Sequence, residues 1–169
     1  LLYDLKGHDG SLTYAAFSGD GKLIITTSKD STARIWKAST GKLLYVLKGH
    51  TDWVSSAAFS PDLKYAITVS WDHSAKIWEI STGRLIQTLK KHTDAVNTVV
   101  FSSDGRYFIT SSKDNTAKVW QSSNGHLLFD LKGHNDWVND AAFSNDKKYF
   151  ITASKDNTAA VWNTANGQK

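Results

Sequence analysis

The stretch Ser112–Trp120, SKDNTAKVW, occurs in four versions along the chain. The other versions, SKDSTARIW, SWDHSAKIW and SKDNTAAVW, begin at Ser28, Ser70 and Ser154. Successive versions are 42 positions apart, and each keeps a serine, an aspartate and a final tryptophan. A period of about forty residues is typical of proteins that stack one small structural unit several times. The sequence therefore indicates four equivalent units.

The second version places a serine, an aspartate and a histidine within four residues, which raises the question of a hydrolytic site. A serine nucleophile needs a base within hydrogen-bond reach and an acid behind that base. The other versions, however, have serine or asparagine in the place of His73. A position that accepts these residues directly after an aspartate is typical of a polar turn. We predict no catalytic residue and no enzymatic activity.

The composition is that of an ordinary globular domain, because 40% of the 169 residues are hydrophobic and 21% are charged. The absence of cysteine excludes disulfide scaffolds and thiolate metal sites, and we predict neither a metal nor a cofactor. The net charge of +4 is spread over all four units, so nucleic acid is only a minor alternative as a ligand. No apolar run approaches about eighteen residues, and the first residues lack a signal-peptide pattern. We expect no membrane partner and a cytoplasmic location.

Each unit contains four short apolar runs, which in the second unit are LLYVL (43–47), WVSSAAF (53–59), YAITVS (65–70) and AKIW (75–78). These runs have the length of strands and are too short for helices. Connectors such as SDGR and STGK place glycine where hairpins need it. The pattern predicts an all-β fold with four antiparallel strands per unit. Small residues such as those of SSAAF in the run 53–59 predict that this strand of each unit is the innermost one, where wedge-shaped sheets converge.

These features resemble the WD-repeat β-propeller family over essentially the whole chain. The resemblance rests on the pairs Gly7-His8, Gly49-His50 and Gly133-His134, the loop aspartates and the tryptophan that ends each third strand. Two departures are Lys91 in place of the glycine before His92, and a residue other than aspartate after each tryptophan: Lys37, Glu79, Gln121 and Asn163. The resemblance implies one domain over residues 1–169 with blades at about 11–47, 53–89, 95–131 and 137–162.

The resemblance also implies a buried hydrogen-bonded clasp of histidine, serine, aspartate and tryptophan inside each blade. Carried over to this sequence, the four clasps are His8, Ser28, Asp30, Trp36; His50, Ser70, Asp72, Trp78; His92, Ser112, Asp114, Trp120; and His134, Ser154, Asp156, Trp162. A buried carboxylate is costly unless it is hydrogen-bonded, and imidazole and backbone amides supply such bonds. The residues that suggest hydrolysis are thus assigned a structural role.

The two ends of the chain predict how the ring closes. The first residues, LLYDL, match the fourth strand of other units, whereas the last blade ends after a third strand, so a strand at 1–5 is expected to complete it. Members of this family mostly have seven or eight blades, and four blades span about half a circle. We therefore predict a two-fold homodimer with eight blades. The alternatives are a compact four-bladed monomer and a fragment; the absence of methionine suggests a processed, truncated or engineered chain.

Residues that differ between units at exposed positions are the candidates for ligand binding. Tryptophan replaces Ser11 or Ala95 at the start of two innermost strands, and Trp71 stands where the other units have lysine. Tryptophan supplies contact area and lysine attracts acidic groups. The candidate ligand-binding residues are Trp53, Trp71, Trp137, Lys29, Lys113, Lys155, Ser11, Thr13, Ser55, Ala95, Asn97 and Asn139.

We predict a non-enzymatic scaffold that binds a protein or peptide, acidic or phosphorylated, on the rim that carries these residues. The alternative is a truncated, amplified or engineered half-propeller whose role is structural self-assembly without a ligand.

Overall fold

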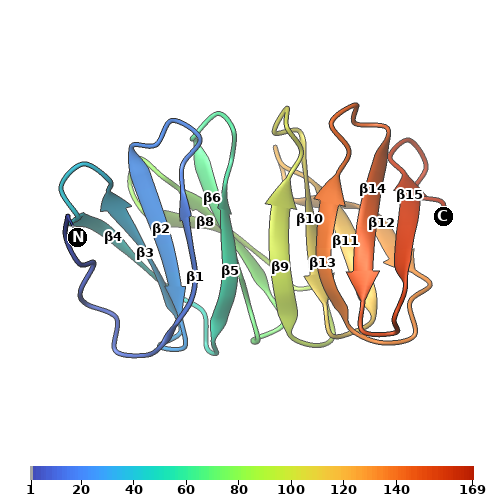
Figure 1. The fold of residues 1–169 in the computed structure, drawn as a ribbon, viewed down its shortest axis with the longest axis horizontal. Helices are drawn as coiled ribbons and strands as arrows, with labels where there is room; N and C mark the ends of the chain where they lie inside the picture. The colour runs from blue at the N-terminus through green and yellow to red at the C-terminus, as the bar shows by residue number, and fades with distance from the viewer. Residues whose placement is uncertain (1) are drawn as a thin grey trace.

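The computed structural model describes residues 2–169 as an all-β fold of four antiparallel sheets, which we call blades 1 to 4 (Figure 1). Blade 1 contains β1 (Leu12–Phe17), β2 (Leu23–Ser28), β3 (Thr32–Lys37) and β4 (Lys42–Lys48). Blade 2 contains β5 (Val54–Phe59), β6 (Tyr65–Ser70), β7 (Ala75–Glu79) and β8 (Arg84–Leu89). Blade 3 contains β9 (Val96–Phe101), β10 (Tyr107–Ser112), β11 (Thr116–Gln121) and β12 (His126–Lys132). Blade 4 contains β13 (Val138–Phe143), β14 (Tyr149–Ser154) and β15 (Ala159–Asn163).

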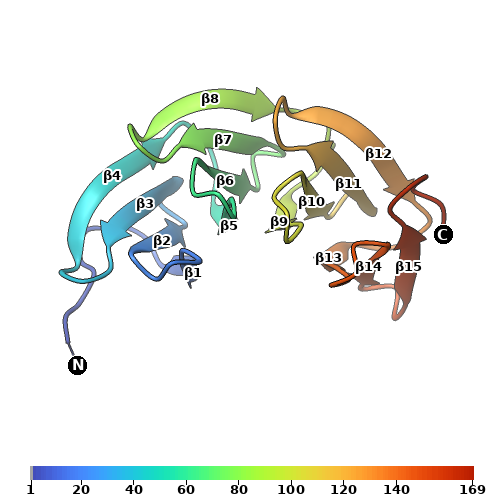
Figure 2. The ribbon, with the colours of Figure 1, turned by 90° about the horizontal axis from the view of Figure 1, so that it is seen from above.

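The strands of each blade pair in chain order, and the four blades stand side by side in an open arc (Figure 2). The first strands β1, β5, β9 and β13 lie on the concave side, and β4, β8 and β12 form the outer wall. This arrangement agrees with the small residues expected in the innermost strand. Within residues 2–169, blade 4 has three strands, and residues 2–7 pair with no sheet. No helix in this range is long and apolar enough to cross a membrane.

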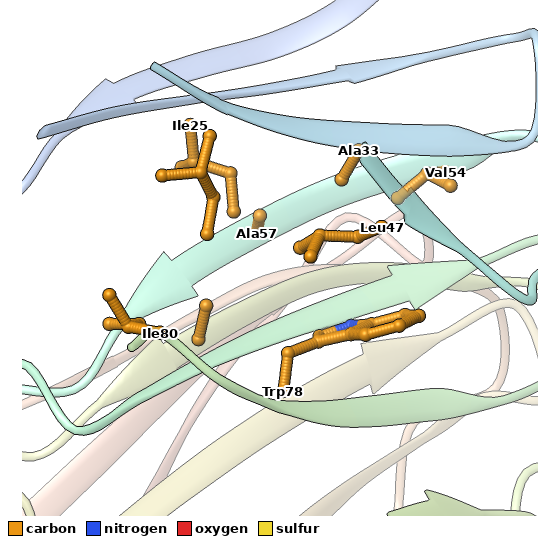
Figure 3. Close-up of a cluster of buried hydrophobic side chains, with 9 residues drawn as sticks. Ile25, Ala33, Leu47, Val54, Ala57, Trp78 and Ile80 are labelled. Atoms are coloured by element: carbon orange, nitrogen blue, oxygen red, sulfur yellow. The ribbon is translucent and has the colours of Figure 1, made fainter. Parts of the chain in front are cut away.

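The core consists of apolar layers between neighbouring blades. Ile25 and Ala33 of blade 1 pack with Val54, Ala57 and Trp78 of blade 2 in one such layer (Figure 3). Equivalent layers join blade 2 to blade 3 and blade 3 to blade 4. A middle strand that is covered on both faces needs apolar or small side chains throughout, which explains the unbroken runs YAITVS and YFITSS.

The turn after each loop aspartate is left-handed. Its residues are Ser31, His73, Asn115 and Asn157, with φ between 64° and 68°. Serine, asparagine and histidine tolerate this backbone better than β-branched residues do. The structure thus confirms the polar turn at His73, whose side chain is exposed.

The two ends of the arc expose apolar side chains whose equivalents elsewhere are buried. Val161 of β15 is 53% exposed, whereas Val119 at the same place in blade 3 is 3% exposed. At the other end Leu12 of β1 is 53% exposed, and its equivalent Val54 is fully buried. The difference arises because blades 1 and 4 each lack one neighbour.

Candidate functional site

Each blade contains a chain of hydrogen bonds in which every group donates to the next one. Blade 3 serves as the example. Trp120 Nε1 donates to Thr110 Oγ1 over 2.9 Å, and this hydroxyl lies 2.8 Å from His92 Nε2. His92 Nδ1 lies 2.7 Å from Asp114 Oδ2. Since a carboxylate only accepts, Nδ1 carries the proton, and Nε2 of the neutral ring accepts from the threonine. The clasp forms in spite of Lys91, which replaces the glycine before His92.

The same clasp recurs in every blade with matching distances. Its members are His8, Thr26, Asp30, Trp36; His50, Thr68, Asp72, Trp78; His92, Thr110, Asp114, Trp120; and His134, Thr152, Asp156, Trp162. The hydroxyl between histidine and tryptophan therefore belongs to a threonine, and the assignment of Ser28, Ser70, Ser112 and Ser154 to this place is wrong.

The serines instead bind backbone groups of the turn. Ser70 Oγ donates to the carbonyl of Asp52 over 3.0 Å and accepts from the amide of Asp72 over 3.0 Å. Thr68 lies one pleat earlier on the same face of β6, where the indole of Trp78 reaches it. The sequence carries a signal for this residue, because a threonine recurs at 26, 68, 110 and 152.

The clasp aspartates are held in the ionised form. Burial raises the pKa of Asp30, but hydrogen bonds from Thr32, His8 and backbone amides outweigh burial and lower the pKa to about 2. In blades 2 and 3 burial likewise raises the pKa of Asp72 and Asp114, and hydrogen bonds led by His50 and His92 bring it well below its usual range. Burial lowers the pKa of the His92 imidazole. A buried neutral histidine that is bonded at both nitrogens stabilises the blade.

The tryptophans and lysines that differ between units form a continuous row on one rim. The indoles of Trp53 and Trp71 lie 4.6 Å apart, and Lys29 Nζ lies 4.0 Å from the Trp53 ring. Lys113 Nζ lies 3.6 Å from the Trp71 ring and 4.3 Å from the Trp137 ring. Lys155 Nζ also lies 4.3 Å from the Trp137 ring. We call these six residues the rim row.

The backbone fixes the row in the same way in every blade. The amide of Lys29 donates to the carbonyl of Ser11 over 3.0 Å, and the amide of Trp71 donates to the carbonyl of Trp53 over 2.9 Å. Equivalent bonds join Lys113 to Ala95 and Lys155 to Trp137. Each bond holds the loop before the clasp aspartate next to the start of the innermost strand.

The rim also carries carboxylates that the sequence analysis missed. Asp52 Oδ1 accepts from the amide of Trp53 over 2.7 Å, and Asp136 Oδ1 accepts from the amide of Trp137 over 2.8 Å. Asp94 caps the amide of Ala95 in the same way. The residue before Trp53, Ala95 and Trp137 is thus an acid in three blades, and before the equivalent Ser11 of blade 1 it is Gly10.

The candidate residues of the innermost strands form contacts between blades. Thr13, Ser55, Asn97 and Asn139 are each the extra residue of a β-bulge, and the first three turn their side chains toward the next blade. Thr13 donates to the carbonyl of Val54, Ser55 to that of Val96, and Asn97 to that of Val138. Asn139 has no such acceptor among the described residues. Ala95 is only 4% exposed, so its prediction as a ligand-binding residue is wrong because it lies beneath the surface.

Chemically, the rim row offers two tilted, contacting indoles and a third indole, with ammonium groups over their rings. The concave side has a hollow lined by Thr13, Ser55, Asn97 and Asn139. Residues 2–169 contain no cluster of three or more histidine, aspartate and glutamate side chains that would hold a metal ion.

Comparison with known proteins identifies the repeat. The family described as "WD domain, G-beta repeat" matches residues 1–37, 41–79, 83–121 and 125–163. Two curated relatives, eukaryotic translation initiation factor 3 subunit I of Debaryomyces hansenii and of Kluyveromyces lactis, are each 50% identical over 38 residues. These alignments cover 22% of this chain and 11% of each relative, which is about the length of one repeat.

Proposed function

Because the chain belongs to the WD40 repeat family, we propose that it is a non-enzymatic scaffold that binds a peptide segment of another protein on the rim row. The observation that carries the proposal is the gathering of all three tryptophans outside the clasps in one row with three lysines. The clasps do not need these tryptophans. Aromatic side chains that remain partly exposed on a rigid surface are typical centres of protein recognition.

The charges of the row favour a ligand with acidic or phosphorylated side chains. The three ammonium groups lie over the indole rings, and Asp52 and Asp136 already accept hydrogen bonds from backbone amides. A peptide would place apolar side chains on the indoles and its anions near the lysines. Charge complementarity of this kind adds specificity and speeds association.

Selection from a displayed peptide library tests this site. The proposal expects enriched peptides to bind the unchanged chain and to lose binding when Trp53, Trp71 and Trp137 are replaced by alanine. The control variant replaces Tyr107 and Tyr149 instead. These exposed tyrosines begin β10 and β14, at the ends of the strands away from the rim row, and the control should retain the same peptides. Peptides that survive the tryptophan replacements would place the site elsewhere. A chain that enriches no peptide would instead be a structural half-ring without a ligand.

We further propose that two copies join end to end into one ring of eight blades. The apolar faces at the two ends of the arc are the faces that pack together at the three contacts inside the chain. Val161 would be covered as Val119 is covered, and Leu12 as Val54 is covered. An exposed apolar face of this kind marks an interaction site. The face at one end of the arc is complementary to the face at the other end, so a second copy of the same chain can cover it.

Hydrogen bonding supports the same closure. Thr13, Ser55 and Asn97 each donate to the first residue of the next innermost strand. The next residue of this series is Asn139, and the matching acceptor in a following copy is the carbonyl of Leu12. Within residues 2–169 no blade follows Asn139 and none precedes Leu12, so one further contact of the same type would form at each junction of the ring.

The segment before blade 1 supplies the strand that blade 4 lacks. At two places the outer strand of one blade contacts a glycine of the next blade. Tyr45 of β4 in blade 1 lies against Gly83 of blade 2, and Phe129 of β12 in blade 3 lies against Gly167 after the last strand of blade 4. Tyr3 lies against Gly41 beside blade 1, although residues 2–7 have no strand partner. The segment therefore already lies where the outer strand of a preceding blade would lie. In the ring that preceding blade is blade 4 of the second copy.

A further inference from the structure

A pocket opens between blades 2 and 3 on the rim opposite the rim row. Its volume is about 510 Å³, which is within the usual range of small-molecule sites. The walls come from the hairpin between β5 and β6, the hairpin between β9 and β10, and the turn after β11. Both hairpins stand at the upper edge of the arc in Figure 1. Tyr65 begins β6 at this pocket, whereas Trp71 of the rim row follows the other end of the same strand.

Small residues create the pocket at positions that are filled at the neighbouring contact. Between blades 1 and 2, Leu63 and Ile80 belong to the apolar layer. The equivalent residues at the contact between blades 2 and 3 are Gly105 and Ser122, and both line the pocket. Pro61 approaches Gly105, whose β-carbon would lie 3.1 Å from the proline ring, but the place of Ile80 remains open beside Ser122.

The hydroxyl of Ser122 is buried and has no hydrogen-bond partner within residues 2–169. The equivalent Thr164 of blade 4 donates to the carbonyl of Lys147 over 2.6 Å. A buried hydroxyl without a partner is unfavourable, and nearly all such groups in folded proteins are bonded. Rotation about the Cα–Cβ bond of Ser122 costs little and would let this hydroxyl bond a ligand in the pocket.

The charged side chains of the pocket leave one cation without a close partner. Lys64 Nζ lies 3.5 Å from Asp62 Oδ2, and Asp62 Oδ1 accepts from the amide of Lys64 over 3.1 Å. Arg106 Nε lies 4.0 Å from Asp104 Oδ2, which lies closer to Lys147 Nζ, at 3.2 Å. The guanidinium of Arg106 is thus held only loosely. It is available to a carboxylate, which arginine binds through two parallel hydrogen bonds.

The contact between blades 1 and 2 shows that a phenol fits at this place in the fold. Tyr45 packs against the same layer as Ile80, and its hydroxyl donates to the carbonyl of Ser81 over 2.6 Å. In blade 2 the place of Tyr45 is taken by Gln87. The carbonyl equivalent to that of Ser81 belongs to Ser123, which lines the pocket.

We propose that the pocket between blades 2 and 3 binds a small aromatic carboxylate with a hydroxyl on its ring. The ring takes the place that Ile80 fills at the other contact, beside Tyr65. The carboxylate binds Arg106, the ring hydroxyl donates to the carbonyl of Ser123, and Ser122 gains the partner that it lacks. The site shares no residue with the rim row, so it gives the scaffold a second ligand of a different kind.

Titration of the intact chain with 4-hydroxybenzoate, followed by the chemical shifts of the backbone amides, tests the site. The amides of Arg106 and Ser122 should shift, with a Kd of about 1 mM or tighter. Arg106→Gln should weaken binding about tenfold, because it removes the charge-assisted bonds. The control Lys148→Gln, at the equivalent position of blade 4, should change the Kd less than about twofold. The neutral analogue 4-hydroxybenzamide should bind about fivefold more weakly or worse.

A second variant fills the pocket with the residue of the neighbouring contact. Ser122→Ile should abolish binding of 4-hydroxybenzoate and raise the Tm by about 2 °C or more, because an apolar side chain then fills the space. The control Thr164→Ile places the same side chain at the equivalent position of blade 4 and should leave binding unchanged. Arg106→Gln changes an exposed side chain, so it tests the site even where Ser122→Ile impairs folding.

Four results would overturn the inference. They are the absence of any shift at about 10 mM 4-hydroxybenzoate, equal binding of the neutral analogue, equal weakening by Arg106→Gln and Lys148→Gln, and unchanged binding by a folded Ser122→Ile protein. Replacement of Trp53, Trp71 and Trp137 by alanine should leave binding of 4-hydroxybenzoate unchanged. Failure of this pocket is therefore distinguishable from failure of the peptide site.

Discussion

The side chain of Tyr3 fills the space beside Gly41, where a β-carbon on the glycine would lie 2.7 Å from the tyrosine ring. Tyr45 fills the space beside Gly83 at the same distance, although Tyr45 belongs to a paired strand and Tyr3 does not. The glycine is left-handed in both turns, with φ of 65° and 69°. Tyr3 thus lies against blade 1 as Tyr45 of β4 lies against blade 2.

Removal of residues 1–6 should separate the two copies. The deletion takes away the segment that would pair with β15, so the ring would lose a strand at each junction while blades 1 to 3 keep all of theirs. Sedimentation at a series of concentrations should show weaker association, with the β-sheet signal in circular dichroism nearly unchanged. Unaltered association after the deletion would mean that the segment is not the missing strand.

An aspartate should have opposite effects at two equivalent valines. Val161→Asp should block association and change the stability of the single chain by no more than about 0.5 kcal/mol, because the side chain is 53% exposed there. Val119→Asp should destabilise folding by about 3 kcal/mol or more, because it buries a carboxylate at a site that is 3% exposed. Urea unfolding with parallel mass measurement distinguishes them, and similar losses of stability would contradict the open face.

The hydroxyl of the clasp threonine should contribute more to the free energy of unfolding than its size suggests. Thr110→Val keeps the shape but leaves Trp120 Nε1 and His92 Nε2 without a partner, so the free energy of unfolding should fall by about 2 kcal/mol. Thr110→Ser keeps the hydroxyl and should cost less. Both are measured by urea unfolding at one protein concentration. A Thr110→Val protein as stable as the parent would remove the threonine from the clasp.

Acid should destabilise the fold in two stages. The lowered pKa of His92 means that the folded state binds fewer protons than the unfolded state, so its contribution is present above pH 6.5 and is lost as the pH falls further. The pKa of Asp30 is about 2 against 3.8 when unperturbed, so its contribution is present above pH 3.8 and is lost on acidification toward 2. Unfolding free energies at pH 7, 5 and 3 should decrease in that order. A flat profile would contradict the assigned protonation states.

The strands and the rim row could be predicted from the sequence because it repeats. A residue that breaks a 42-residue period stands out beside its equivalents. Trp71 among lysines is the clearest example. The clasp hydroxyl was misplaced because serine and threonine recur with the same period two residues apart, and only the position of the indole in space separates Thr110 from Ser112. The bulge that directs Asn97 to the next blade leaves no trace in hydrophobic spacing. Burial of Ala95 likewise depends on the blade beside it.

The ring of two copies is tested most directly by the mass of the intact chain in solution, measured by light scattering across a range of concentrations. The account predicts twice the 18.7 kDa of one chain, about 37 kDa, with Val161→Asp at the single-chain value. A mass of 18.7 kDa for the unchanged chain at all concentrations would contradict it, because the faces that carry Leu12 and Val161 would then have no second copy to cover them.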